Sequence, residues 1–192
     1  MNIDIITNII IIYYSLLLVN TGGIKLIAQL FGIGAMVFLF LIYQQRSRKG
    51  MLLTKLSADI CWVMHYLLLG AFAGLIPNAV GVFRELVFIN RKDKKWASSV
   101  IWPIIFVIVN WTLGILSFSS WYDILPILAS SFVTFSLWLD DPRLTKIITV
   151  PICIAFLTYD VFVGSYIGIV NELLSIISIV SFFIKNKGSK ER

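Results

Sequence analysis

Ionisable side chains interrupt two long apolar stretches of this sequence at Lys55, Asp59 and Arg84. Lys55 and Asp59 are spaced i, i+4, so in a helix they share one face and can form an ion pair. A charged side chain inside a bilayer costs about 2.5–3.5 kcal/mol on insertion scales, which makes each such residue a functional candidate. Two interpretations stay open for Lys55, Asp59 and Arg84. They form an intramembrane ion pair that locks two helices, or they form part of a functional site.

A second set of polar residues lies nearer the opposite ends of the apolar stretches, toward the predicted outer face of the membrane. No Lys or Arg lies nearby in the sequence to neutralise Asp160 and Glu172, so we expect His65, a cation or a proton as their partner. Pro77 can kink its helix, and broken helices beside polar groups can build a binding site at the middle of a membrane. An ordinary packing histidine is the alternative interpretation of His65. The predicted site for a small polar solute consists of His65, Asn78, Asp160, Asn171 and Glu172.

Motifs of known enzyme chemistry are missing from the sequence. There is no H-E-x-x-H, no nucleophile elbow and no P-loop. Asp140-Asp141 stands before Pro142, which is more typical of a helix end than of a metal-bound diphosphate site. Cys61 and Cys153 lie within apolar stretches, where cysteine behaves as a small hydrophobic residue. We therefore predict that the protein is not an enzyme and has no catalytic residues, metal or cofactor.

The elements that position these residues follow from composition. Hydrophobic residues make up 59% of the 192 residues and charged residues 14%, with a mean hydropathy of +0.92. A soluble domain would be about 45–50% apolar and about 25% charged, so too few charges exist here to cover a surface facing water. The net charge of +6 would suggest nucleic acid as a partner of a soluble protein. Because the basic residues flank apolar segments, we predict lipid instead, and an all-α integral membrane fold.

Apolar segments long enough to cross a bilayer fill nearly the whole chain, with short polar or glycine-bearing links between them. The first link is Asn20-Thr21-Gly22, so we expect an extra hydrophobic helix before a core of seven transmembrane helices. A separate crossing of the membrane by residues 3–19 is favoured over a helix lying at the membrane surface. The predicted parts are a hydrophobic helix at 1–20, a three-helix repeat at 23–90, a linker helix at 98–117, a second three-helix repeat at 122–185, and a cytoplasmic tail at 186–192.

Basic residues are distributed unevenly between the links. Every Lys and Arg except Lys25 lies in or near alternate links and the C-terminal end. Cytoplasmic loops of membrane proteins carry an excess of these residues. The pattern therefore predicts a multi-pass protein of the cell membrane whose C-terminus is cytoplasmic.

A shift of 94 positions brings two glycine-bearing corners into register. Gly70 and Gly74 coincide with Gly164 and Gly168, and His65 coincides with Tyr159. Each corner joins two apolar helices, and the charge pattern gives both three-helix units the same orientation. An odd number of crossings ends on the side opposite its start, so a linker helix must separate the units. The resulting 3+1+3 plan is similar to that of SWEET and PQ-loop transporters.

The sequence also resembles the YgjV family of bacterial inner membrane proteins. The resemblance rests on the run from Cys61 to Gly70 with Arg84 after it, on Ala28-Gln29 with Gly32, on Ile124 to Leu128, and on Gly164-Ser165 with Glu172. It covers about residues 24–185 and implies a seven-helix inner membrane protein, without an activity to carry over. The N-terminal segment departs from the family pattern. So does Tyr159, which stands where a second histidine is expected.

Two functions from different classes fit these patterns. The first is a small-solute transporter or facilitator, in which two three-helix repeats surround the polar site. The second is a non-transporting membrane scaffold or interaction partner on the same fold, because a fold alone does not define a function. The sequence identifies neither a solute nor an oligomeric state.

Overall fold

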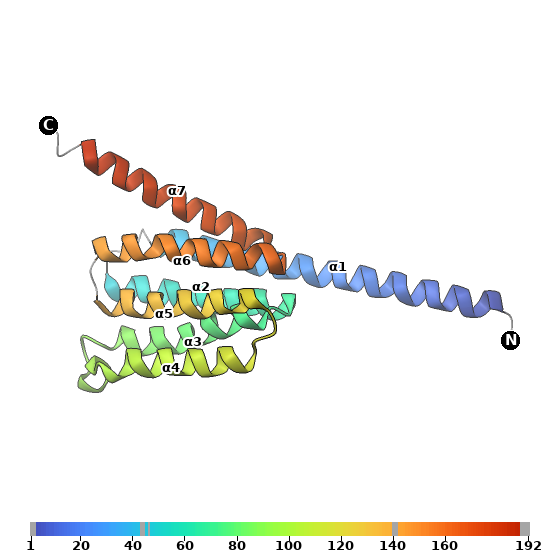
Figure 1. The fold of residues 1–192 in the computed structure, drawn as a ribbon, viewed down its shortest axis with the longest axis horizontal. Coiled ribbons are helices and arrows are strands. Elements are labelled where there is room, and N and C mark those ends of the chain that lie inside the picture. Colours follow the sequence, from blue (N-terminus) through green and yellow to red (C-terminus); the bar gives the residue numbers. More distant parts are fainter. Residues whose placement is uncertain (1–2, 43–44, 46, 140–141, 189–192) are drawn as a thin grey trace.

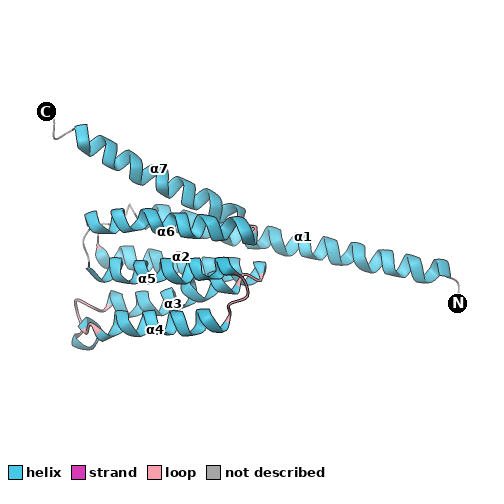
Figure 2. Cartoon of the chain, in the orientation of Figure 1, coloured by secondary structure: helices cyan, strands magenta, loops and turns pink. Residues whose placement is uncertain are grey.

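Helices form nearly all of the computed structural model, which describes residues 3–42, 45, 47–139 and 142–188 (Figures 1 and 2). No strand occurs in this part of the chain. The α-helices are α1 (Ile3–Ile42), α2 (Arg48–Leu69), α3 (Phe72–Ile89), α4 (Ile101–Leu116), α5 (Ile124–Leu139), α6 (Pro142–Val163) and α7 (Tyr166–Gly188). Two 3-10 helices, η1 (Lys95–Ser98) and η2 (Trp121–Asp123), precede α4 and α5. The fold is that of an all-α membrane protein.

The first helix corrects one prediction. Residues 3–42 form one continuous helix, so the predicted link at Asn20-Thr21-Gly22 is wrong, and the crossing of the membrane by residues 3–19 stays a prediction. Glycine lowers helix propensity by about 1 kcal/mol but does not end a helix as proline does. At about 1.5 Å per residue, the 40 residues of α1 span about twice the hydrocarbon thickness of a bilayer. Accordingly, the N-terminal half of α1 extends beyond the other helices (Figure 1).

Length and hydropathy identify the segments that can cross a membrane. Gly22–Ile42, Arg48–Leu69, Phe72–Ile89 and Trp121–Leu139 are long and apolar enough to do so. Shorter apolar helices occupy Ile101–Leu116, Ile147–Val163 and Tyr166–Ser181. Residues 186–188, predicted as the start of the tail, continue α7, and residues 189–192 lie outside the described residues.

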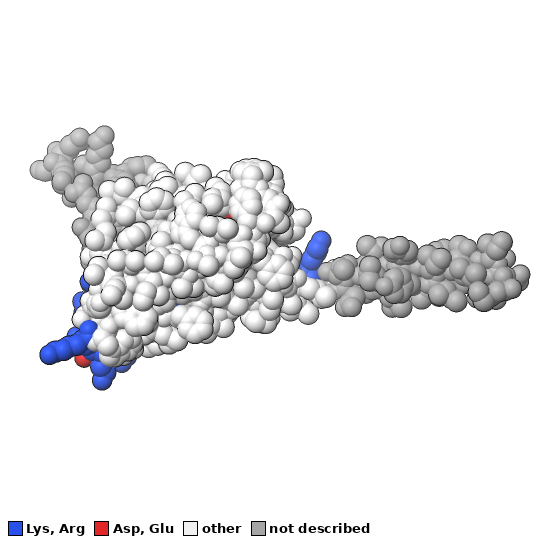
Figure 3. Space-filling model, turned by 60° about the horizontal axis from the view of Figure 1, so that its bottom comes forward, with Lys and Arg blue, Asp and Glu red and all other residues white. Residues whose placement is uncertain are grey.

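The polarity of the bundle is the reverse of that of a soluble protein. Large apolar side chains cover its flanks, among them Phe83 and Leu116, which are 65% and 79% exposed. Charged side chains are buried instead, including Arg84 at 2% and Glu85 at 0% exposure. Lys and Arg side chains gather at one end of the bundle, and the visible flank is almost free of charge (Figure 3). This distribution suits a protein whose sides face lipid.

Helices pack most closely against their neighbours in sequence, which gives two groups, α1–α3 and α5–α7, with α4 lying against α3 and α5. Small residues allow the closest approaches, as is usual between membrane helices. Ala28 and Ala35 of α1 are fully buried. A Cβ atom on Gly32 between them would lie 3.0 Å from His65 Nδ1 and 3.1 Å from Ile167 Cβ. Gly32 thus brings α1 against both α2 and α7.

The α2–α3 and α6–α7 corners are built alike. Gly70 and Gly164, 94 positions apart, have φ angles of 68° and 69°, in the left-handed region that favours glycine. The Ala71 amide donates to the Tyr66 carbonyl, and the Ser165 amide donates to the Asp160 carbonyl, both at 2.9 Å. Each corner therefore ends its first helix with the same hydrogen bond at equivalent positions, and it fixes where the next helix begins.

Candidate functional site

Four charged side chains of α2 and α3 form a compact cluster. Lys55 Nζ lies 2.8 Å from Asp59 Oδ1 and 3.3 Å from Glu85 Oε1. Arg84 Nη2 lies 3.2 Å from Glu85 Oε1 and 4.0 Å from Asp59 Oδ2. Each cation therefore faces both carboxylates, and with all four groups ionised their formal charges cancel. The sequence indicated three members of this cluster, and Glu85, which is fully buried, is the fourth.

Local packing holds this charged cluster in place. A Cβ atom on Gly81 would lie 2.7 Å from Asp59 Oδ2, so the glycine allows the carboxylate to sit against α3. Arg84 Nη1 donates to the hydroxyl of Thr134 on α5 at 3.0 Å, which connects the cluster to the second group of helices. Arg84 Nε and Glu85 Oε2 are buried without a hydrogen-bond partner among the described residues. Buried polar atoms without a hydrogen bond are costly, and a bound water or ligand often supplies the missing hydrogen bond.

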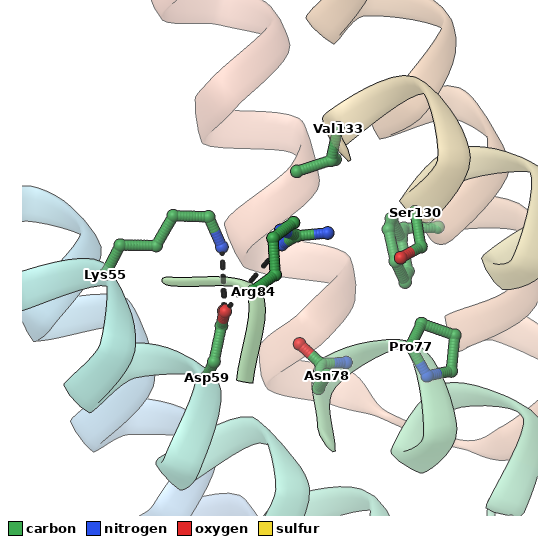
Figure 4. Close-up of a pocket in the computed structure, with 8 residues that line it drawn as sticks. Lys55, Asp59, Pro77, Asn78, Arg84, Ser130 and Val133 are labelled. Carbon is green, nitrogen blue, oxygen red and sulfur yellow. Dashed lines mark hydrogen bonds and ion pairs between the residues drawn. The ribbon is translucent and has the colours of Figure 1, made fainter. Parts of the chain in front are cut away.

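Asn78 belongs with this charged cluster and not with the other predicted solute-binding residues. It lines a small cavity together with Lys55, Asp59, Arg84 and Ser130 (Figure 4). Its Nδ2 donates to the Gly74 carbonyl one turn earlier, at 2.8 Å. The amide nitrogen is thus engaged with its own helix, and the amide oxygen is the group left to accept a hydrogen bond.

His65 lies at the meeting point of α1, α2 and the α6–α7 corner, and it is fully buried. Its Nδ1 is 2.7 Å from the Ala28 carbonyl oxygen and its Nε2 is 2.8 Å from Ser165 Oγ. The carbonyl can only accept, so Nδ1 carries a hydrogen, and in the neutral ring Nε2 accepts from the Ser165 hydroxyl. The neutral ring therefore has a hydrogen-bond partner at both nitrogens. A second proton on the ring would make Nε2 a donor and release the hydroxyl hydrogen.

Tyr66 and Asp160, which are also 94 positions apart, bond directly to each other. The Tyr66 hydroxyl donates to Asp160 Oδ1 at 2.8 Å, and both residues are buried. Among the described residues, Asp160 therefore bonds to a tyrosine hydroxyl and not to His65, and a cation or a proton as its further partner stays a prediction. Asp160 Oδ2 lies near the Ser165 hydroxyl, which is already engaged with His65, and it has no well-aligned hydrogen bond of its own among the described residues. A Cβ atom on Gly168 would lie only 2.3 Å from both Asp160 Oδ2 and Ser165 Oγ, so this glycine makes room for the carboxylate.

Two further contacts join the helix groups at this level. The Gly74 amide donates to the Tyr159 hydroxyl at 2.8 Å. The Ile167 amide donates to Gln29 Oε1 at 3.1 Å. Together with the bonds of His65 and Tyr66, these contacts form a polar layer between α1–α3 and α5–α7. The polar layer consists of Gln29, His65, Tyr66, Gly74, Tyr159, Asp160 and Ser165.

Asn171 and Glu172 lie on α7 beside this polar layer. Asn171 Nδ2 donates to Glu172 Oε1 at 3.0 Å, and the Cys153 thiol also hydrogen-bonds to Glu172. Glu172 is close enough to Tyr66 and Asp160 to interact with them electrostatically. Of the predicted solute-binding residues, the structure therefore brings His65, Asp160, Asn171 and Glu172 into one region.

Sequence reasoning missed Ser165 and Thr134 as partners of the ionisable groups. Ser165 follows the glycine of the second corner, and that position is the signal that could have identified it. Thr134 lies within an apolar helix and offers no such signal. Within the described part of the chain, no group of three or more His, Cys, Asp or Glu side chains is placed to hold a metal ion.

Comparison with known proteins places the chain in a family. Residues 26–189 match the model of the Imp-YgjV family, described as bacterial inner membrane protein. No curated protein and no solved structure matched the chain. The match covers most of the chain and includes the charged cluster, the polar layer and both glycine corners. The chain therefore belongs to the Imp-YgjV family of bacterial inner membrane proteins, as the sequence resemblance indicated.

Proposed function

We propose that this inner membrane protein is a small-solute transporter or facilitator with a polar site between two three-helix repeats. The repeats would be α1–α3 and α5–α7, and α4 would be the helix that joins them. The two corners support this division, because Gly70 and Gly164 have the same backbone conformation and equivalent hydrogen bonds. Parallel repeats on either side of a site at the middle of the membrane are a known transporter architecture.

The observation that carries the proposal is the polar layer between the two groups of helices. Tyr66 and Asp160 occupy equivalent positions of the repeats and bond to each other across their boundary. Tyr159, the equivalent of His65, reaches the opposite corner at Gly74, and His65 reaches the other corner at Ser165. Hydrogen bonds between membrane helices contribute about 0.6 kcal/mol each on average, so such a boundary can open and close at modest cost.

Asp160 adds a reason to expect a second state or a ligand. Its Oδ2 is buried, and the partner that the described residues offer it is the Ser165 hydroxyl, which is already engaged with His65. Such an atom costs about 1–3 kcal/mol or more when it is charged, unless something satisfies it. A solute, a proton or a cation that entered the polar layer would remove this cost. Glu172, which interacts electrostatically with Asp160, would respond to the same event.

Uptake into proteoliposomes tests the proposal. The panel covers sugars, amino acids, nucleosides and organic acids, with protein-free liposomes as the blank. We expect at least one solute to enter faster with the wild-type protein, and the Asp160→Asn, Glu172→Gln double variant to lower that rate at least tenfold. The matched control is Asp93→Asn, which changes an exposed carboxylate in the connection after α3. Equal rates for the wild type and the double variant would refute the proposal that Asp160 and Glu172 belong to the solute site. No uptake of any solute, with stable co-purification of another membrane protein, would favour a scaffold instead.

The orientation is part of the same proposal. The basic end of the bundle would face the cytoplasm, because positive residues collect on that side of membrane proteins (Figure 3). Single-cysteine variants Lys94→Cys and Lys25→Cys, in a chain with Cys61 and Cys153 replaced by alanine, provide the test. A membrane-impermeant thiol reagent added to intact cells should label the variant at position 25 and not the one at position 94. The opposite labelling pattern would show that the bundle has the reverse orientation in the membrane.

A further inference from the structure

A small cavity lies between the two helix groups, on the side of Asn78 away from the polar layer. It is bordered by α2, α3, α5 and α6 and has a volume of about 60 Å³. A cavity needs about 10–15 Å³ to hold one water molecule, so this one has room for about four to six water-sized groups. The residues that line it are Lys55, Asp59, Pro77, Asn78, Arg84, Ser130, Val133 and Phe156 (Figure 4).

The lining offers one donor and one acceptor that the protein itself leaves open. Arg84 is 2% exposed, and its Nε–H has no hydrogen-bond partner among the described residues. The Asn78 amide nitrogen is engaged with the Gly74 carbonyl, so its oxygen is the group left to accept. In Figure 4 the side chains of Asp59, Arg84 and Asn78 converge on the same space. A ligand with one acceptor and one or more donors would therefore complete these groups.

The charges beside the cavity select against an ion. Lys55 and Arg84 face Asp59 and Glu85, and the four formal charges cancel when all are ionised. A solute with a net charge would bring an uncompensated charge into the interior of a membrane protein. If the charge costs as much as a charged side chain inserted into a membrane helix, the solute occupies the cavity roughly a hundredfold less. A neutral or zwitterionic solute avoids this penalty, because its polar groups pair with charges that are already balanced.

We propose that this cavity binds a small uncharged or zwitterionic polar solute of about four to six non-hydrogen atoms. The proposal rests on the transport function above and names the class of solute that would be carried. Urea and glycine are the probes of this class. Each has a charged counterpart of nearly the same shape, guanidinium for urea and glycolate for glycine, and glucose is the oversized neutral probe.

Flux of these five probes into proteoliposomes is the test. We expect the wild-type protein to carry urea or glycine at least tenfold faster than the charged counterpart and than glucose. Val133→Phe, which fills the cavity, should lower that flux at least tenfold. Its matched control is Val161→Phe, at a position on α6 that is 59% exposed, and this variant should leave the flux unchanged. Thermal unfolding and size-exclusion chromatography establish that each variant is folded. If Val133→Phe does not fold, Ser130→Val replaces it and should lower the flux at least threefold.

The outcomes separate this proposal from the transport function. Flux of urea or glycine that neither cavity variant alters would overturn the binding site. Flux of other solutes of the uptake panel, without urea or glycine, would overturn the solute class and leave the transport function standing. Equal flux of guanidinium and urea would refute the argument from charge balance. If no solute crosses faster than in protein-free liposomes, both proposals fall.

Discussion

Replacing Glu85 with glutamine tests whether the four buried charges balance one another. Glu85 is fully buried, and its Oε1 is shared between Arg84 Nη2 at 3.2 Å and Lys55 Nζ at 3.3 Å. The substitution keeps the shape of the side chain and removes its charge. Lys55 and Arg84 then face Asp59 alone, so one positive charge inside the bundle loses its counterpart.

The size of the effect follows from these distances. At an effective dielectric constant of about 20, two unit charges 3.3 Å apart attract by about 5 kcal/mol. The cost of removing the charges from water offsets much of this attraction, so the pair as a whole adds little stability. Removing one partner is different, because it leaves the other charge buried and unpaired. We therefore expect Glu85→Gln to lower the free energy of unfolding by about 3–5 kcal/mol.

Equilibrium unfolding in lipid–detergent bicelles measures this change, and a second substitution makes the test specific. Lys55→Gln added to Glu85→Gln leaves Arg84 opposite Asp59 and restores a neutral pair. The double variant should be more stable than the sum of the two single effects predicts, by about 1–3 kcal/mol. Lys94→Gln, at an exposed position, is the control and should change stability by less than about 0.5 kcal/mol. Additive effects, or a Glu85→Gln effect as small as the control, would refute the charge-balance reasoning.

Two further predictions use the same unfolding measurement. Tyr66→Phe leaves the buried carboxylate of Asp160 without the hydrogen bond that Tyr66 donates, so it should cost about 1–3 kcal/mol, whereas Tyr166→Phe at a site 71% exposed should cost less than about 0.5 kcal/mol. Equal effects of the two tyrosine substitutions would contradict the assigned bond. Gly164→Ala places a side chain at a φ angle of 69° and should cost about 1–2 kcal/mol, whereas Gly23→Ala, which adds a Cβ atom in open space within α1, should raise stability by up to about 1 kcal/mol. A stabilising effect of Gly164→Ala would show that the corner does not need its left-handed glycine.

The sequence alone determined the solvent, the fold class and the family of this protein. Apolar surface is driven out of water in proportion to its area, whatever the order of the residues along the chain. A composition of 59% hydrophobic and 14% charged residues therefore already requires lipid around the helices. The glycine corners could also be located from sequence. A left-handed residue at a helix end is a local backbone requirement, and Gly70 and Gly164 meet it.

Only the tertiary structure decided which polar groups meet. The rotation of each helix about its axis sets these contacts, and that rotation depends on packing between segments as far as 138 positions apart. His65 therefore met Ser165 where a carboxylate was expected, and Asp160 met Tyr66. Asn78 joined the charged cavity for the same reason. The continuous α1 was decided in a different way, since two glycines weaken a helix but do not end it.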